Sequence, residues 1–238
     1  MLNLKEEQKY GQLRKLSREL HIPTPEAFLT LEVFDKDGKL IQRHKQRSHS
    51  WVRNAYNLMF CQLGGKDADT GVGEFGAGYL SFKDTGAAVK QGNYTGAITD
   101  PSSSADAVGN AYRAAVSTVD YGIIIGSGTN PESFEGYALQ TPIQEGNGAG
   151  QLNHLQQEEP VASYTPSTKT FKVVHIRYMN NNSGGDVSVN EVGLVDKMRY
   201  DAMFPYILMS RDKLVSTVTI PDTGQLKVTY TIQLTYPA

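Results

Sequence analysis

The five histidines are the first residues to consider for metal binding or acid–base chemistry, because imidazole ligates metals and titrates near neutral pH. No two of them stand four residues apart on a predicted helix with an acidic partner, and none combines with the single cysteine, Cys61, in a zinc-binding pattern. His175 lies in an alternating segment typical of a half-buried strand, and His44 and His49 lie in a polar stretch where we expect them to be solvated. The spacing of these residues therefore predicts no metal ligand and no catalytic histidine.

Glycines and serines offer two further motifs. Gly71-Val-Gly73-Glu-Phe-Gly76 matches the dinucleotide fingerprint, but it follows the polar stretch GGKDADT and continues into the β-like letters YLSF. A working fingerprint follows an apolar strand and opens a helix, so we interpret this motif as a loop. Ser127 has a glycine directly on each side, which does not match the G-x-S-x-G elbow of serine hydrolases.

Closely spaced carboxylates are also few. Asp35 with Asp37, and Asp67 with Asp69, are the weak calcium candidates, and the DKDG turn already explains the first pair. Glu158-Glu159 lies in a polar loop, where neighbouring acids without an enclosing cleft do not form an acid–base pair. We therefore predict no catalytic residue, no metal site and no cofactor.

One basic cluster stands out, RHKQRSHSWVR, with Arg43, Lys45, Arg47 and the aromatic Trp51. Nucleic-acid phosphates are one partner for such a run, and an acidic patch on a neighbouring subunit is another. The simpler interpretation is a solvated strand and helix start whose charges discourage edge-to-edge aggregation. A net charge of −2 provides no general attraction to nucleic acid or to anionic membranes, so neither is an expected partner.

Residues 1–25 are predicted to form an N-terminal helical arm. Residues 2–20 have the pattern of an amphipathic helix, with Leu2, Tyr10, Leu13, Leu16 and Leu20 roughly on one face, and prolines at 23 and 25 end it. So short a helix is marginal alone, and its apolar face must dock on its own domain or on a neighbour. Together with the basic cluster, Leu13, Leu16 and Leu20 are the predicted interface residues.

Three further regions follow the arm. Residues 26–63 are predicted to form a hairpin around Asp37-Gly38 and then a helix from Ser48 or Ser50 to about Leu63, packing on the core. Residues 64–118 are rich in Gly, Ala and Ser and form a predicted loop insertion, a second candidate interface. Residues 119–238 contain several short alternating strands separated by the turn clusters NNNSGG and PDTG, which predict an antiparallel sandwich core.

Composition agrees with this class. The chain has 238 residues with 23 Gly, 13 Tyr and one Trp, a mixture that suits short strands and tight turns. The lone Cys61 excludes an intrachain disulfide and is expected to be a small buried side chain. With no secretory signal and no long apolar window, we expect a protein made in a cytoplasm. The predicted fold is mainly β, an antiparallel β-sandwich of jelly-roll or Ig-like type with an N-terminal helix, a second short helix and a Gly-rich insertion.

The C-terminal half also resembles a recurrent type of tailed-bacteriophage virion structural protein. The residues that carry the resemblance are IIIGSGTNPESFEGYALQTPI (123–143), GQLNHL (150–155), VVHIRYMNNNSGGDVSVNEVGLV (173–195), ILMSRDKL (207–214) and VTIPDTGQLKVTYTIQLTY (218–236). Within them, Glu191, Arg211 and Asp212 are expected to form a cross-strand ion pair or to reach turn amides, as residues that maintain the fold.

The resemblance implies a non-enzymatic component of a virion, assembled in the host cytoplasm as a neck, collar, tail-associated or capsid-associated homo-oligomer. Its partners would be copies of itself and other virion proteins. The alternative is a receptor- or glycan-binding module of a phage fibre or spike.

Overall fold

The protein is mainly β, with antiparallel sheets and two helices. The computed structural model describes residues 3–64, 81–90, 108–109, 111–198 and 204–237. Within them the chain forms two α-helices and eleven strands, and every pairing between strands is antiparallel. Most of the predicted insertion, the glycine motif at 71–76 and the aspartates at 67 and 69 lie outside the described residues.

The larger sheet has the strand order β2-β1-β11-β8-β6, and β7 also pairs with β8. Its strands are β1 (Thr24–Phe34), β2 (Leu40–Ser48), β6 (Asn153–His154), β7 (Val161–Thr165), β8 (Thr170–Asn180) and β11 (Gln225–Thr235). The predicted hairpin is confirmed, with Gly38 at a φ of 75° in its turn and the Asp35 carboxylate accepting from the Asp37 and Lys39 amides. Because β1 lies between β2 and β11, the hairpin is an integral part of this sheet and not a separate layer.

A smaller sheet has the order β10-β9-β5. Its strands are β5 (Gly122–Gly126), β9 (Val187–Lys197) and β10 (Tyr206–Ile220), and a separate two-stranded sheet joins β3 (Phe82–Lys83) to β4 (Val89–Lys90). The sequence predicts two strands between 204 and 220, whereas β10 is one strand with a bulge after Lys213.

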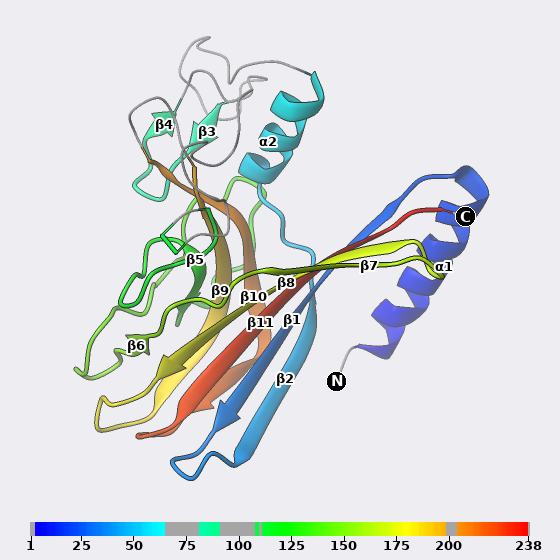
Figure 1. Ribbon diagram of the computed structural model, residues 1–238. Helices are drawn as coiled ribbons and strands as arrows, with labels where there is room; N and C mark the ends of the chain where they lie inside the picture. Colours follow the sequence, from blue (N-terminus) through cyan, green and yellow to red (C-terminus); the bar gives the residue numbers. More distant parts are fainter. Residues whose placement is uncertain (1–2, 65–80, 91–107, 110, 199–203, 238) are drawn as a thin grey trace.

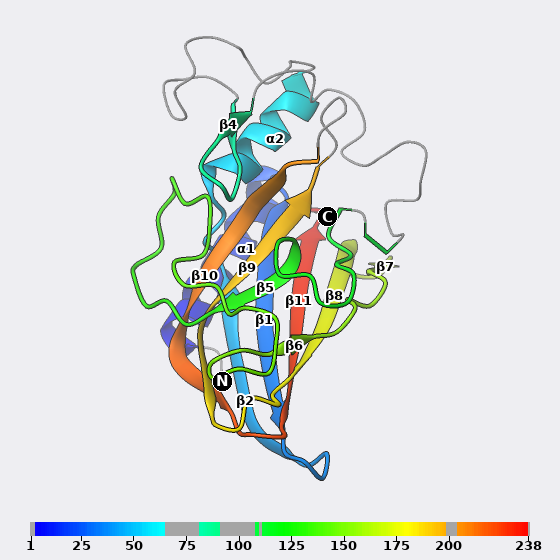
Figure 2. The same cartoon turned by 90° about the vertical axis from the view of Figure 1, so that its left-hand side faces the viewer.

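The larger sheet and the smaller sheet face each other across one apolar core (Figure 2). On β1, Leu29, Leu31 and Val33 are fully buried in this core, while the intervening residues point to the outer face of the larger sheet. Ile123 of β5 and Leu194 of β9 pack into the same core from the smaller sheet. The alternation of period two in the sequence therefore has its usual cause, one buried and one outer face.

Both predicted turn clusters carry the chain from one sheet to the other. The turn at 180–185 joins β8 to β9, and the turn at 221–224 joins β10 to β11. Asn181 is fully buried between them and donates from its side chain to the carbonyls of Gly185 and Ile220. The Asp222 carboxylate accepts from the amide of Gly184, so the two turns stabilise each other.

Side-chain amides join the two sheets along one edge. Gln46 of β2 donates to the Lys213 carbonyl and accepts from the Val215 amide. Gln42, four residues earlier on β2, donates to the Thr217 carbonyl and accepts from the Thr219 amide. These bonds satisfy the backbone of β10 where its bulge interrupts pairing with β9.

The second helix, α2 (Arg53–Gly64), begins later than the sequence predicts. The backbone before it is extended, since the Val52 amide donates to the Met209 carbonyl and Trp51 bridges to Ser210 of β10. Cys61 is buried with Phe82 in a small apolar cluster, as expected of a small hydrophobic side chain.

Candidate interaction surface

The N-terminal helix α1 (Leu4–Leu20) lies against the outer face of the larger sheet, beside the first residues of β1 (Figure 1). Its first turn is capped by the Asn3 side chain, which accepts from the Lys5 amide. It ends at His21, whose φ of 55° is the left-handed conformation that closes many helices. The predicted helix is thus confirmed, and the arm docks on its own domain.

A buried arginine of β2 makes the central contact. The guanidinium of Arg47 lies over two aromatic rings, 3.6 Å from the ring centre of Tyr10 on α1 and 4.7 Å from that of Phe28 on β1. In its own plane it forms two bonds to the Glu7 carboxylate, from Nε at 2.6 Å and from Nη2 at 3.0 Å. This combination of stacking and bidentate pairing is a use of arginine that lysine does not reproduce.

A second ion pair extends this contact along the helix. Glu26 of β1 accepts from Arg47 and also from Nη1 of Arg14, the latter at 3.0 Å to each carboxylate oxygen. The hydrogen bond from Arg47 lowers the pKa of Glu7, although burial acts in the opposite direction. Burial alone would lower the pKa of Arg47, but its bonds to Glu7 and Glu26 raise it. The helix is therefore held on the sheet by charged and aromatic side chains.

The leucines of α1 take no part in this contact with the sheet. Leu13, Leu16 and Leu20 are 47%, 51% and 62% exposed, and Ile22 just beyond the helix is 56% exposed. The spacings of three and four residues place the three leucines along one side of the helix. We name Leu13, Leu16 and Leu20 the leucine ridge. Of the predicted apolar face, Tyr10 docks on the sheet and the leucine ridge does not, so charged side chains make most of the contact. Docking of the ridge on a neighbouring chain stays a prediction.

The basic cluster does not act as one unit. Arg43 and Lys45 are exposed on the outer face, where Arg43 lies 3.4 Å from Glu32 and Lys45 lies over the Phe28 ring. Arg47 is buried in the contact with α1, which contradicts its interpretation as a solvated charge. Trp51 is half-buried and packs against the apolar core. Phosphate recognition by the whole run is therefore not supported, since α1 covers Arg47 on the outer face and Trp51 packs against the core.

The histidines are dispersed. His44 is buried, not solvated as predicted, because its ring lies between the side chains of Gln46 and Ser216. His49 is half exposed, and His175 is buried in β8 beside the Tyr112 ring. Burial lowers the pKa of His175 to about 4.

A cluster that maintains the fold surrounds Glu191. Its carboxylate accepts from Nε of Arg211 at 2.7 Å and from the amides of Gly128, Gln140 and Thr141. The predicted ion pair and the predicted contact with turn amides are both confirmed for these two residues. Asp212 differs, since it bonds to Ser48 and Ser210.

The glycines at 126 and 128 are explained by the same carboxylate. A Cβ at Gly126 would lie 2.4 Å from Glu191 Oε1, and one at Gly128 would lie 2.5 Å from it. The predicted tight loop therefore requires glycine because an acid from β9 occupies the adjoining space. The sequence contained both motifs but no signal that they touch.

The described residues contain no group of three or more His, Cys, Asp or Glu side chains placed to hold a metal ion. Over the same residues, neither helix has both the length and the apolar character needed to cross a bilayer. Comparisons of the chain with protein-family models, with curated proteins and with solved structures find no match.

Proposed function

We propose that this protein is a non-enzymatic structural component of a tailed-bacteriophage particle. Assembled in the host cytoplasm, it occupies the virion as a neck, collar, tail-associated or capsid-associated subunit. It binds copies of itself and other virion proteins. The sequence motifs of the C-terminal half support the virion assignment, and the leucine ridge supports assembly as the activity.

The orientation of α1 is the observation that carries this proposal. A helix that docked to stabilise its own domain would bury its leucines, because apolar burial is the main favourable contribution to packing. Here the charged side docks and the leucine ridge remains exposed. A helix held rigidly with its apolar residues outward is a preorganised surface for another protein chain.

The sheets provide the scaffold, which we propose to be a β-sandwich of jelly-roll or Ig-like type. Two antiparallel sheets share one core, and buried polar groups such as Glu191 and Asn181 tie the connecting loops to it. A scaffold of this kind holds α1 and the loops in constant positions while copies repeat around a symmetric assembly.

The position of the unusual acids supports a non-catalytic role. Burial raises the pKa of Asp196 to about 8 and that of Asp212 to about 6, values that a general acid could use. Both carboxyl groups are enclosed in the core, where no substrate reaches them. We therefore assign these residues to the folded core and not to a reaction.

Three substitutions in the leucine ridge test the proposal. The variant Leu13→Ser, Leu16→Ser, Leu20→Ser is introduced into the phage genome, and its abundance in purified particles is measured by quantitative mass spectrometry. We expect at least a tenfold loss of incorporation, with the melting temperature of the isolated protein unchanged within about 2 °C because the ridge is already exposed.

A matched variant controls for loss of helix propensity. Gln8→Ser, Gln12→Ser, Lys15→Ser places the same three serines on exposed positions of another side of α1, and it should be incorporated normally. Equal incorporation of the two variants would overturn the proposal.

A further inference from the structure

A second surface lies on the same outer face of the larger sheet, at the end remote from α1. It is a shallow pocket of about 470 Å³ between the β1–β2 turn and the turn at 221–224. Glu26, under α1, and Phe34, in the pocket, are eight residues apart on β1, or roughly 27 Å along a strand. The pocket is therefore separate from the leucine ridge.

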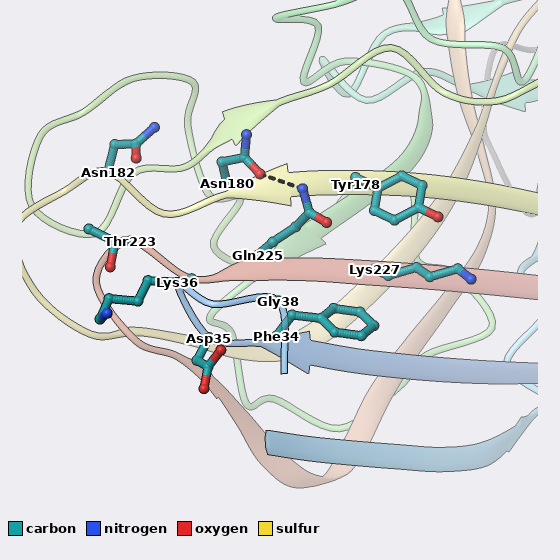
Figure 3. A pocket seen from close by; sticks show the side chains of 11 residues that line it. Phe34, Asp35, Lys36, Gly38, Tyr178, Asn180, Asn182, Thr223, Gln225 and Lys227 are labelled. Atoms are coloured by element: carbon teal, nitrogen blue, oxygen red, sulfur yellow. Dashed lines mark hydrogen bonds between the residues drawn. The ribbon is translucent and has the colours of Figure 1, made fainter. Parts of the chain in front are cut away.

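Two aromatic side chains flank the floor of this pocket. Phe34 of β1 and Tyr178 of β8 lie on either side of β11, whose Gln225 and Lys227 side chains lie between them (Figure 3). Since neighbouring strands are about 4.8 Å apart, β1 and β8 are separated by roughly 10 Å. That span is about the length of two linked sugar rings, so one ring can stack on an aromatic face while the next reaches the other wall.

The strand register brings polar groups to the same floor. Gln225 stands directly opposite Phe34 on one side and Asn180 on the other, and its amide nitrogen donates to the Asn180 oxygen at 2.8 Å. This bond orients both amides and leaves the Gln225 oxygen and the Asn180 nitrogen without a partner among the described residues. One acceptor and one donor are thus held side by side, the arrangement that pairs with adjacent hydroxyls.

Further hydrogen-bonding groups line the margin. The Tyr178 hydroxyl has no partner within the described residues, and the side chain of Thr223 is exposed. Asn182 donates to Asn153 and keeps its oxygen available, while Asp35 is fixed by bonds from two backbone amides. The two lysines of the pocket lie near acids: Lys36 Nζ is 3.1 Å from Asp37 and Lys227 Nζ is 3.9 Å from Glu32. Lys227 Nζ also lies 5.8 Å from the centre of the Tyr178 ring, so a sugar would stack on the ring beside this ammonium group.

We propose that this pocket binds a neutral, hydroxyl-rich saccharide through Tyr178, Phe34 and the Asn180–Gln225 amide pair. Aromatic faces that stack on the C–H side of a sugar, with a few fixed donors and acceptors, match the composition of a small-ligand site. A phosphate or other anion would need an unpaired cation, and an apolar ligand would leave the amide pair without partners. The inference is independent of the assembly role, since it uses none of the residues of α1.

Binding is tested with the full-length purified chain. An array of bacterial surface oligosaccharides identifies a bound sugar, and saturation-transfer NMR and titration calorimetry then measure its affinity. We expect Tyr178→Ala and Phe34→Ala each to weaken binding about tenfold or more through loss of stacking, and Gln225→Ala to weaken it severalfold.

Exposed aromatics of the β7–β8 hairpin supply matched controls. Tyr164→Ala and Phe171→Ala each remove a side chain of the same type from an exposed position outside the pocket, and they should leave the affinity for the sugar within twofold. If an alanine variant unfolds, Tyr178→Phe keeps the ring, and chemical-shift mapping on the unmodified protein should show the Asn180 and Gln225 side-chain amides perturbed by the sugar.

Absence of binding to every array glycan and to millimolar mono- and disaccharides would overturn the inference. Binding that is unchanged in Tyr178→Ala and Phe34→Ala would do the same. Loss of particle incorporation in these variants without sugar binding would assign the pocket to a protein contact instead, while leaving the assembly proposal intact.

Discussion

Two arginine–glutamate pairs in this protein have similar geometry and different consequences. Arg211 and Glu191 lie 2.7 Å apart inside the smaller sheet, and Arg47 and Glu7 lie 2.6 Å apart under α1. Glu191 is fully enclosed, and with Arg211 it fixes the loop from Gly128 to Thr141. Glu7 is 30% exposed and fixes only the position of a helix. The surroundings of an ion pair therefore decide whether it supports the fold or positions a surface.

Energetics follow from this difference in burial. Removing one member of an enclosed pair leaves a charge without compensation, which costs about 3–5 kcal/mol. Removing one member of a partly exposed pair costs about 1 kcal/mol or less, because water and salt replace it. The following substitutions extend the comparison from the most enclosed group to the most exposed.

Arg177 of β8 should give the largest effect, since it is fully buried and its partners in the described part of the chain are all carbonyl oxygens. Its guanidinium donates to five backbone carbonyls, those of Ala115, Thr118, Tyr121, Ile123 and Leu155. Arg177→Leu removes the side-chain donor from all five oxygens, of which that of Ala115 also accepts from the Thr118 amide, and we expect a loss of about 4 kcal/mol or more in the free energy of unfolding. Chemical denaturation measures it, with the exposed Lys172→Leu on the same strand as a control within about 0.5 kcal/mol.

Glu191→Gln should cause the next largest loss in the free energy of unfolding. The substitution leaves Arg211 without its counter-charge and replaces one acceptor oxygen by a donor facing backbone amides. We expect a loss of about 3 kcal/mol and faster hydrogen exchange at Gly128, Gln140 and Thr141. A double-mutant cycle with Arg211→Met should show a coupling above about 1 kcal/mol, and strict additivity of the two substitutions would contradict the enclosed pair.

Asp196 is an enclosed acid whose charged form destabilises the folded state. Both of its carboxylate oxygens are buried with no hydrogen-bond partner among the described residues, and burial raises its pKa from 3.8 to about 8. Between pH 4 and 8 the folded state therefore keeps a proton on Asp196 that the unfolded state has released. The contribution of this group to the free energy of unfolding is complete below pH 4 and is lost as the pH rises to 8.

Asp196→Asn removes that dependence. We expect it to stabilise the protein by about 2 kcal/mol at pH 8 and by much less at pH 4, in thermal melts at both values. An equal change at both pH values would show that ionisation is not the cause.

Glu7→Gln should have the smallest effect on global stability, about 1 kcal/mol or less, but a clear effect on α1. The pKa of Glu7 is lowered by its bond from Arg47, so docking is favoured at neutral pH and weakens as pH falls through that lowered value. The protection factors of the α1 amides against hydrogen exchange, corrected for the intrinsic rate at each pH, should fall severalfold in the variant, and the same fall should appear in the unmodified protein on acidification. Glu19→Gln, at a more exposed position of the same helix, should change neither.

Local features were readable from the residues. The 3.6-residue spacing of α1, the Asp37-Gly38 turn and the alternation in β8, β9 and β11 each predicted an element that the structure contains. The end of the first helix was predicted from its prolines, and the ends of the strands from their turn clusters. These signals are local because backbone hydrogen bonding and side-chain direction depend on neighbours within a few residues.

Relations between distant residues were not readable. Alternation shows that a residue faces inward but not which sheet it belongs to, so the passage of the chain between sheets at Asn181 and Asp222 was not predicted. Strand β7 was also missed, because all five of its residues are exposed and it has no alternation. The later start of α2 depends on a bond from Val52 to β10, a partner more than 150 residues away.

Local patterns of residues are sufficient to predict the β class, the helix at the N-terminus and a leucine side on that helix. The outward direction of this side depends on tertiary contacts, because Arg47 and Glu26 come from two strands that must pair before they can bind α1 through Glu7, Tyr10 and Arg14. The same holds for the pocket beside β11, whose residues converge through strand register. Propensity and periodicity act within one segment, whereas charge complementarity and shape exist only after segments have met.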